Sequence, residues 1–243
     1  MRAAMDPPTG PVGPAKLAAL LGRLHKGLIV SCQAEADEPL HGAKIMSAMA
    51  RAAYAGGAKG IRANSPQDIH EIRKSVDLPI IGIYKVDMPG YAVRITPTIE
   101  AALQVAEAGA DIIAIDATFR PHPDDMSLDE RIRLIHELTL CPVMADISVY
   151  EEGIAARDAG ADLIATTLSG YTGNAPTPAP PDLALLQSLI KAIDIPVVAE
   201  GRISTPEQAF QALALGAFAV VVGSAITRPQ WITAQFVRRM MDA

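Results

Sequence analysis

Charged and hydroxyl side chains recur in this sequence directly after short apolar runs. The clearest case is "IIGIYK", in which Lys85 closes a run that reads as a buried strand. Burying one ammonium alone is costly, but opposite charges and a bound substrate offset that cost. Similar positions hold Gln33, Arg62, Asp116 with Thr118, Asp146 with Ser148, Thr166 with Thr167, Glu200 with Arg202, and Gly223 with Ser224. Brought together, such groups can bind a polar, charged substrate.

Ligation of a metal by histidine or cysteine is not expected. The five histidines fall in predicted helices or loops, and no pair of them has metal-ligand spacing. His122 is expected to be a solvated loop residue, and Asp124 and Asp125 are expected to cap the following helix. We therefore predict no bound metal.

The elements that must position these side chains form an internal repeat. One group of segments begins at residues 26, 78, 141 and 195 and reads "KGLIVSCQ", "LPIIGIYK", "CPVMADIS" and "IPVVAEGR". A second group begins at 57, 109, 160 and 216 and reads "GAKGIRAN", "GADIIAID", "GADLIATT" and "GAFAVVVG". The two groups alternate along the chain, with helical patterning between them, which is typical of a repeating strand–helix architecture.

Each repeat predicts a buried strand followed by a helix. Apolar runs bounded by Gly or Pro suit strands of a parallel sheet, and Ser65-Pro66 and Thr205-Pro206 are typical helix starts. Eight strands alternating with eight helices predict an α/β fold, a single-domain (β/α)8 TIM barrel. A doubly wound sheet is disfavoured because no Gly-x-Gly-x-x-Gly loop follows the first strand. The chemistry of such barrels lies at the carboxyl ends of the strands, where the polar residues above would converge.

Outside the repeats, the sequence predicts two terminal features. Residues 1–13 are Pro/Gly-rich and are expected to form a flexible tail, which leaves residues 14–243 as the barrel domain. A leading helix is expected over 14–27, closed by Gly27, and "FVRRMM" predicts an amphipathic final helix. Trp231 is expected at the barrel rim or at a subunit contact.

Charge and cysteine content limit the partners and the compartment. The formal net charge of -6 argues against nucleic acid as a partner, and no apolar stretch reaches the roughly 20 residues of a membrane span. Cys32 ends one predicted strand and Cys141 precedes another, so the two thiols are expected at opposite ends of the sheet. Unpaired thiols fit a cytoplasmic protein.

A phosphate site is predicted at the ends of the last two strands, "AEGRIS" and "VVGSAI". Barrels frequently bind phosphate there through backbone N–H groups. Gly201 and Gly223 let the backbone approach closely, and Ser224 adds a hydroxyl. The alternative is that these glycines only make tight turns. The long segment 170–182 either covers the mouth or is a rigid connector.

The residues at the strand ends carry a resemblance to a known family. "GLIVSCQA", "GIRAN", "IIGIYKVDMPG", "DIIAIDATFRP", "ADISVYEEG", "TTLSGYTG", "VVAEGRI" and "VGSAITRPQWIT" resemble the N-acylglucosamine-6-phosphate 2-epimerases. These are the N-acetylmannosamine-6-phosphate epimerases of bacterial sialic acid catabolism. The similarity spans roughly residues 27–240 and touches the end of every strand, so it is more specific than a shared barrel.

The resemblance implies an isomerase that converts N-acetylmannosamine 6-phosphate to N-acetylglucosamine 6-phosphate without a cofactor. It assigns Lys85 and Glu200 as catalytic residues. It assigns Gln33, Arg62 and Asp146 to binding of the sugar, and Arg202 to binding of the substrate as a further positive charge. A homodimer is an expectation for such barrels, and the sequence shows no decisive interface.

Several roles stay open at this stage. Lys85 is the candidate for proton transfer at C2 and Glu200 for ring opening, but both could act as bases on opposite faces of C2. Structural alternatives are ion pairs of Lys85 with Asp87 and of Glu200 with Arg202. Asp146 either orients a sugar hydroxyl or holds Lys85.

Two other classes of function compete with this interpretation. A sugar-phosphate decarboxylase would need an Asp-x-Lys-x-x-Asp array, but residue 83 is Ile, and a pentulose-phosphate epimerase would need histidines and a metal. A non-catalytic sugar-phosphate binding protein would need an anion pocket and no base. A turnover assay separates the last alternative from an enzyme.

Overall fold

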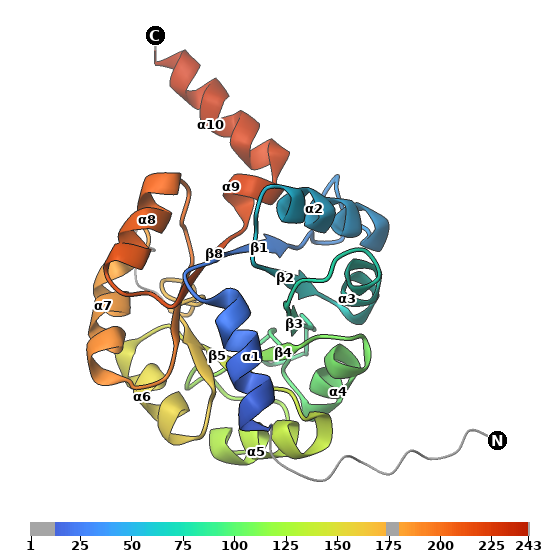
Figure 1. The fold of residues 1–243 in the computed structure, drawn as a ribbon, viewed down its shortest axis with the longest axis vertical. Coiled ribbons are helices and arrows are strands. Elements are labelled where there is room, and N and C mark those ends of the chain that lie inside the picture. Colours follow the sequence, from blue (N-terminus) through green and yellow to red (C-terminus); the bar gives the residue numbers. More distant parts are fainter. Residues whose placement is uncertain (1–12, 174–179, 243) are drawn as a thin grey trace, which may run out of the picture.

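The protein is a closed barrel of eight parallel strands surrounded by helices (Figure 1). The structure, a computed structural model, describes residues 13–173 and 180–242. The tail predicted over 1–13 lies outside the described residues except for Gly13, as does part of the 170–182 segment. Each strand pairs with the next in sequence, and β8 pairs with β1, so the predicted (β/α)8 barrel is confirmed.

The strands fall where the repeats place them. They are β1 (Leu28–Cys32), β2 (Gly60–Asn64), β3 (Ile80–Ile83), β4 (Ile112–Asp116), β5 (Val143–Asp146), β6 (Leu163–Ala165), β7 (Val197–Glu200) and β8 (Ala219–Val222). Seven helices connect them: α2 (Ala43–Ala55), α3 (Pro66–Arg73), α4 (Ile99–Glu107), α5 (Leu128–Thr139), α6 (Tyr150–Asp158), α7 (Leu183–Ala192) and α8 (Pro206–Ala214). The predicted caps are confirmed, because Ser65 accepts a hydrogen bond from the N–H of Asp68 and Thr205 accepts one from that of Gln208.

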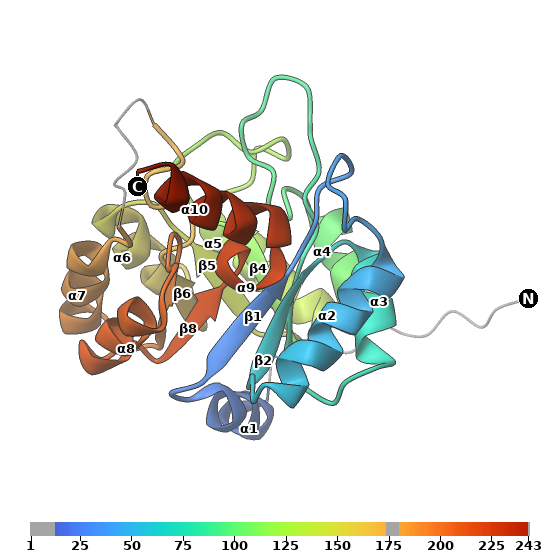
Figure 2. The ribbon, with the colours of Figure 1, turned by 90° about the horizontal axis from the view of Figure 1, so that it is seen from above.

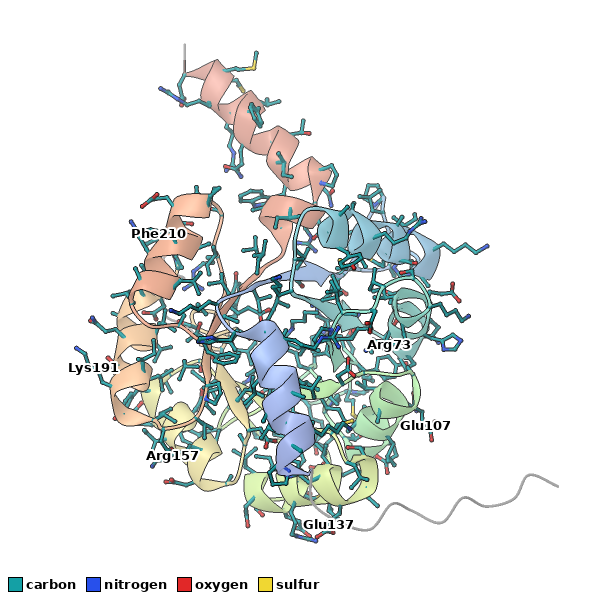
Figure 3. All side chains as sticks on the ribbon, in the orientation of Figure 1. Arg73, Glu107, Glu137, Arg157, Lys191 and Phe210 are labelled. Carbon is teal, nitrogen blue, oxygen red and sulfur yellow. The ribbon has the colours of Figure 1, made fainter. Side chains whose placement is uncertain are left out.

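The strands are buried on both faces, which explains their continuous apolar runs. One cluster fills the space between strands and helices, and a second fills the barrel interior. On the outside, charged side chains of the connecting helices such as Glu107, Glu137 and Lys191 point away from the barrel (Figure 3).

The leading helix α1 (Pro14–Leu24) closes the amino-terminal end of the barrel (Figure 2). Leu20 and Leu24 belong to the interior cluster, and each buried leucine contributes about 1.5–3 kcal/mol. The prediction that Gly27 ends this helix is wrong. The helix ends at Leu24, and Lys26 takes the left-handed conformation, with φ 52°. Gly27 is needed for space instead, because a Cβ there would lie 2.6 Å from the Cβ of Lys59.

After β8 the chain forms two helices where one was expected. These are α9 (Ser224–Thr227) and α10 (Pro229–Met241), and Pro229 begins the second. No residue of α10 is buried by any described part of the chain, and the helix projects away from the barrel (Figure 1). This arrangement leaves Phe236 and Met240 67% and 74% exposed.

Two further expectations concern the cysteines and the membrane. Cys32 and Cys141 are both free and buried, so the predicted absence of a disulfide between them is confirmed. Among the described helices, none has the length and apolar character needed to cross a membrane.

Candidate active site

The carboxyl ends of the strands surround a cavity of about 700 Å³. Its lining includes eight of the nine residues predicted for the site: Gln33, Arg62, Lys85, Glu200, Gly201, Arg202, Gly223 and Ser224. Among the residues that the structure describes, six cations and two carboxylates line it. The barrel has therefore gathered side chains far apart in sequence into one polar, predominantly cationic pocket, as the positions at the strand ends predict.

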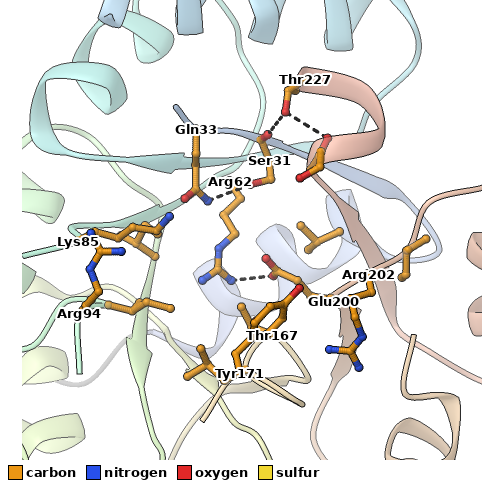
Figure 4. A pocket seen from close by; sticks show the side chains of 18 of the residues that line it. Ser31, Gln33, Arg62, Lys85, Arg94, Thr167, Tyr171, Glu200, Arg202 and Thr227 are labelled. Carbon is orange, nitrogen blue, oxygen red and sulfur yellow. Dashed lines mark hydrogen bonds and ion pairs between the residues drawn. The ribbon is translucent and has the colours of Figure 1, made fainter. Parts of the chain in front are cut away.

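Arg62 lies at the centre of the site (Figure 4). Its side chain is 1% exposed, and its Nη1 donates to Oδ1 of Asp146 at 3.0 Å and to Oε2 of Glu200 at 2.8 Å. Its Nη2 pairs with the other carboxylate oxygen of Asp146. Burial opposes the charge, but the two carboxylates raise the pKa of Arg62 further above its ordinary value. One buried cation therefore faces two carboxylates.

The Nε of Arg62 has no hydrogen-bond partner among the described residues, although it is buried. A buried donor without a partner costs about 1–3 kcal/mol. The Nε itself is inaccessible to solvent, so a ligand in the cavity would reach this N–H only if neighbouring side chains moved.

Glu200 ends β7 and faces Arg62 across the cavity floor (Figure 4). Its backbone is fixed by Thr166, whose hydroxyl accepts from the Glu200 N–H at 3.1 Å and donates to the Glu200 carbonyl at 2.8 Å. Burial raises the pKa of Glu200 to about 7, with Arg62 opposing the rise and Asp146 adding to it. A carboxyl group with this pKa can both give and take a proton near neutral pH. The alternative ion pair with Arg202 is wrong, since Glu200 pairs with Arg62.

Asp146 is the one predicted site residue that does not line the cavity. It is 0% exposed, and its carboxylate is occupied by Arg62 and by the hydroxyl of Thr167, which donates at 2.5 Å. The structure thus places Asp146 behind Arg62. The alternative in which it holds Lys85 is wrong, because its carboxylate is bonded to Arg62 and Thr167.

Lys85 follows β3 and lines the cavity. In Figure 4, Lys85 and Glu200 lie on opposite sides of Arg62. The Nζ of Lys85 lies 2.9 Å from Oε1 of Glu35. The alternative ion pair with Asp87 is wrong, because Asp87 pairs with Arg94. Lys85 and Glu200 therefore line one cavity, each with a different partner.

Arg202 follows Glu200 and is held in the left-handed conformation, with φ 58°. A non-glycine residue in this region is uncommon and often occurs at functional sites. Its guanidinium donates to the carbonyl of Ser169 and, at 3.1 Å, to that of Pro180, and it lies 5.5 Å from the centre of the Tyr171 ring. Arg202 thus lines the cavity while it fixes the chain that follows β6.

The predicted phosphate-binding residues lie at the start of α9. Gly223 is its N-cap residue, and Ser224 is its first residue. A Cβ on Gly223 would lie 3.4 Å from the Cβ of Ser31, which is ordinary van der Waals contact, so space alone does not require glycine there. Arg228 lines the same part of the cavity and pairs with Glu38.

Several lining residues were not predicted from the sequence. Arg94, Arg120, Tyr171, Thr227 and Arg228 all line the cavity, and so does Trp231, which was expected at the rim or at a subunit contact. Arg120 lies shortly after the end of β4. Its position close to a strand end could therefore have identified it as a site residue. Arg94 and Trp231 lie well beyond their strands, and only the fold brings them to the mouth.

The expectations for the loop after β4 are wrong. His122 is buried, 8% exposed, and burial followed by the charge of Arg131 lowers its pKa. Asp124 pairs with Arg131, and the cap of α5 is Ser127. In the part of the chain that the structure describes, no group of three or more potential metal ligands comes together.

The geometry of the cavity defines a class of site. A cationic cavity suits an anionic ligand, and a carboxyl of near-neutral pKa opposite a lysine suits proton transfer. Figure 4 shows these groups around Arg62. The chain is therefore a barrel with the features of an acid–base enzyme for a charged small molecule.

Comparison with known proteins gives the family. Residues 46–242 match the sequence model of a family described as "Putative N-acetylmannosamine-6-phosphate epimerase". A relative from Caldanaerobacter subterraneus named "Putative N-acetylmannosamine-6-phosphate 2-epimerase" is 52% identical over 219 residues, 90% of this chain and 92% of the relative. One of the same name from Clostridioides difficile is 47% identical, covering 90% and 98%.

Solved structures agree with the sequence comparison. The N-acetylmannosamine-6-phosphate 2-epimerase from Clostridium perfringens is 45% identical and superposes with a TM-score of 0.87, covering 90% of this chain and 95% of that one. A thiamine phosphate pyrophosphorylase from Pyrococcus furiosus, 20% identical with a TM-score of 0.57, shares only the fold. This chain belongs to the N-acetylmannosamine-6-phosphate epimerase family.

Proposed function

We propose that this protein is an isomerase that interconverts N-acetylmannosamine 6-phosphate and N-acetylglucosamine 6-phosphate in bacterial sialic acid and amino sugar catabolism. Membership of the family supports this substrate. The observation that carries the proposal to this chain is that Lys85 and Glu200 line one cationic cavity.

The reaction inverts C2, which is acidic only when the sugar ring is open and C1 is an aldehyde. Removal of the C2 proton gives an enediolate, and return of a proton to the other face gives the epimer. Such proton transfers contribute about 10²–10⁴-fold each when an acid or base is positioned. The reaction has no net redox change, so the proposal includes no redox cofactor and no metal.

We assign Lys85 to proton transfer at C2 and Glu200 to proton transfer at the ring oxygen or at O1. The pKa of about 7 lets Glu200 act in both directions of ring opening and closing. In the alternative mechanism, Lys85 and Glu200 both act as bases, on opposite faces of C2. That mechanism requires the same two side chains in the same cavity.

Arg62 and Gln33 are assigned to the enediolate oxygen. Both side chains line the cavity, which supports this role, and the amide of Gln33 also donates to Ser31 Oγ at 2.9 Å. A fixed donor at a developing oxyanion contributes on the order of 3 kcal/mol. Asp146 supports the sugar-binding site through Arg62, which it holds in place.

The phosphate is assigned to the other part of the cavity, at Gly201, Gly223 and Ser224. The cations Arg202 and Arg228 line the cavity beside these residues and favour a dianion there. We place the sugar carbons between this end of the cavity and Lys85, since all of these residues line it.

The proposal extends to the assembly and the compartment. We propose a homodimer in which α10 contributes to the interface, because a helix of 13 residues with no buried residue is marginal alone. A second copy is the partner proposed, since symmetric dimers are the commonest assemblies. A cytoplasmic location fits a sugar phosphate substrate and the free thiols.

A single assay can test the proposed function. Purified protein is incubated with N-acetylmannosamine 6-phosphate, and the product is identified by proton NMR. Binding is followed in parallel through Trp231, the one tryptophan of the chain, which lines the cavity. We expect the gluco epimer to form and unphosphorylated N-acetylmannosamine to react far more slowly. A fluorescence change without any epimer would identify a binding protein and contradict the proposal.

A further inference from the structure

The backbone of Lys85 is fixed where the chain leaves β3. Its N–H donates to Oδ1 of Asn64 at 2.9 Å, and Lys85 forms an antiparallel bridge with Ile95. The N–H of Val86 donates to the carbonyl of Arg94 at 3.0 Å. With the main chain held in this way, the position of the ammonium depends on what the end of the side chain contacts.

That contact is Glu35, in the segment between β1 and α2 that also carries Gln33. Nζ of Lys85 donates to Oε1 of Glu35 at 2.9 Å. The two side chains are 24% and 35% exposed, so the pair is neither fully screened by water nor deeply buried. Lys85 lines the cavity and Glu35 does not, so Glu35 acts on the cavity through the cations that it contacts, of which Lys85 is the nearer.

The second oxygen of Glu35 faces another cation. Oε2 lies 3.7 Å from Nη2 of Arg94, and Arg94 is itself held by Asp87. Partial burial opposes ionisation of Glu35, but the hydrogen bond and charge of Lys85, followed by the charges of Arg94 and Arg228, lower its pKa. Glu35 therefore places a negative charge beside Lys85 at neutral pH.

Three other cations that line the cavity have carboxylate partners of their own. Arg228, between α9 and α10, pairs with Glu38. Arg120, after β4, pairs with Asp116. Arg62, in β2, pairs with Asp146 and Glu200. Glu35 is thus the carboxylate that the structure pairs with Lys85.

We propose that Glu35 is a positioning residue for Lys85, because it holds the ammonium group of Lys85 at the cavity wall. The inference rests on the proposed function, in which Lys85 must be neutral to accept the C2 proton. A carboxylate within about 4–6 Å favours the charged form of its partner by roughly 1–3 pH units, and partial exposure reduces this effect.

The first test does not depend on activity. The wild type, Glu35→Gln and Asp87→Asn are each labelled with ¹³C-lysine, and their lysine resonances are followed by NMR as the pH is changed. The resonance of Lys85 is assigned by its loss in Lys85→Arg. Glu35→Gln keeps an acceptor oxygen but removes the charge. Asp87→Asn is the matched control, because it removes a charge from the same cluster without touching Lys85. We expect the titration midpoint of Lys85 to fall by about one pH unit in Glu35→Gln and by much less in Asp87→Asn.

The second test uses the epimerase assay. In Glu35→Gln, the acid limb of the pH profile of kcat/KM should move to lower pH, and the maximal kcat should fall several-fold. Glu35→Asp, which keeps the carboxylate, should restore part of the lost kcat. Coincident Lys85 titrations in wild type and Glu35→Gln would overturn the role of Glu35, whatever the activity. Absence of epimerisation by the wild type would overturn the proposed function instead and leave the NMR result to decide the role of Glu35.

Discussion

At the scale of single residues, the account depends first on Lys85. Replacing Lys85 with alanine should lower kcat by about 10²-fold or more, because a positioned base contributes about that much. Lys74→Ala, which breaks the exposed pair with Glu71, is the control and should leave kcat unchanged. Circular dichroism of the same samples shows whether both fold. A Lys85→Ala variant with more than a tenth of wild-type turnover would remove Lys85 from the mechanism.

Glu200 gives a prediction about stability. Its folded-state pKa of about 7 exceeds the ordinary value of 4.5, so the folded state binds the proton more tightly than the unfolded chain. The stability that this proton supplies is complete below about pH 4.5 and is lost as the pH rises through about 7. Glu200→Gln keeps a neutral side chain at every pH.

The unfolding free energy of Glu200→Gln relative to wild type should therefore increase from pH 5 to pH 8, on the order of 2 kcal/mol. Urea unfolding at several pH values measures it. The exposed Glu107→Gln serves as the control. A difference that stays flat, or that declines with rising pH, would show that Glu200 is not held with a raised pKa.

At the scale of elements, the position of Lys85 depends on how β3 packs against its helices. Gly82 leaves no room for a side chain, since an added Cβ would lie 2.5 Å from Cγ1 of Val105 and 2.7 Å from Cβ of Ala110. Gly82→Ala should lower the unfolding free energy by about 1–3 kcal/mol. It should also lower kcat, because β3 must shift.

Gly22→Ala is the matched comparison for Gly82. No atom lies within 4 Å of a Cβ built on Gly22, which is in α1. Alanine there should raise the unfolding free energy by about 0.5–1 kcal/mol without affecting kcat. Thermal denaturation and turnover of both variants test the pair. Equal stability of the two variants would mean that β3 tolerates the extra methyl group.

The strands were predictable because parallel strands buried on both faces leave apolar runs between Gly and Pro. Residues at strand ends, such as Gln33 and Glu200, were found for the same reason. Glu35 and Arg94 were not found, because they lie on connecting segments whose paths depend on tertiary contacts. Asp146 was expected on the cavity wall, but in the structure Arg62 stands in front of it and takes its oxygens.

At the scale of the whole molecule, α10 leads to a prediction about assembly. Phe236 and Met240 are large apolar residues on a helix that projects from the barrel (Figure 1). Burial of such side chains in a dimer is worth about 1.5–3 kcal/mol each. Phe236→Ser with Met240→Ser should therefore convert a dimer to a monomer in light scattering after gel filtration.

The control for assembly is Phe210→Ser, which removes an equally exposed phenylalanine, 65% exposed, from α8. It should leave the dimer intact. A monomeric wild type would contradict the proposed dimer, and dissociation by Phe210→Ser alone would move the interface to α8.

The central claim is that proton transfer at C2 takes place in this cavity, and exchange with solvent measures it most directly. The protein is incubated with N-acetylmannosamine 6-phosphate in D₂O until the two epimers reach equilibrium, and the C2 position is read by proton NMR. We expect both sugar phosphates to carry deuterium at C2. Epimers that reach equilibrium with protium still at C2 would contradict a mechanism of deprotonation and reprotonation at that carbon.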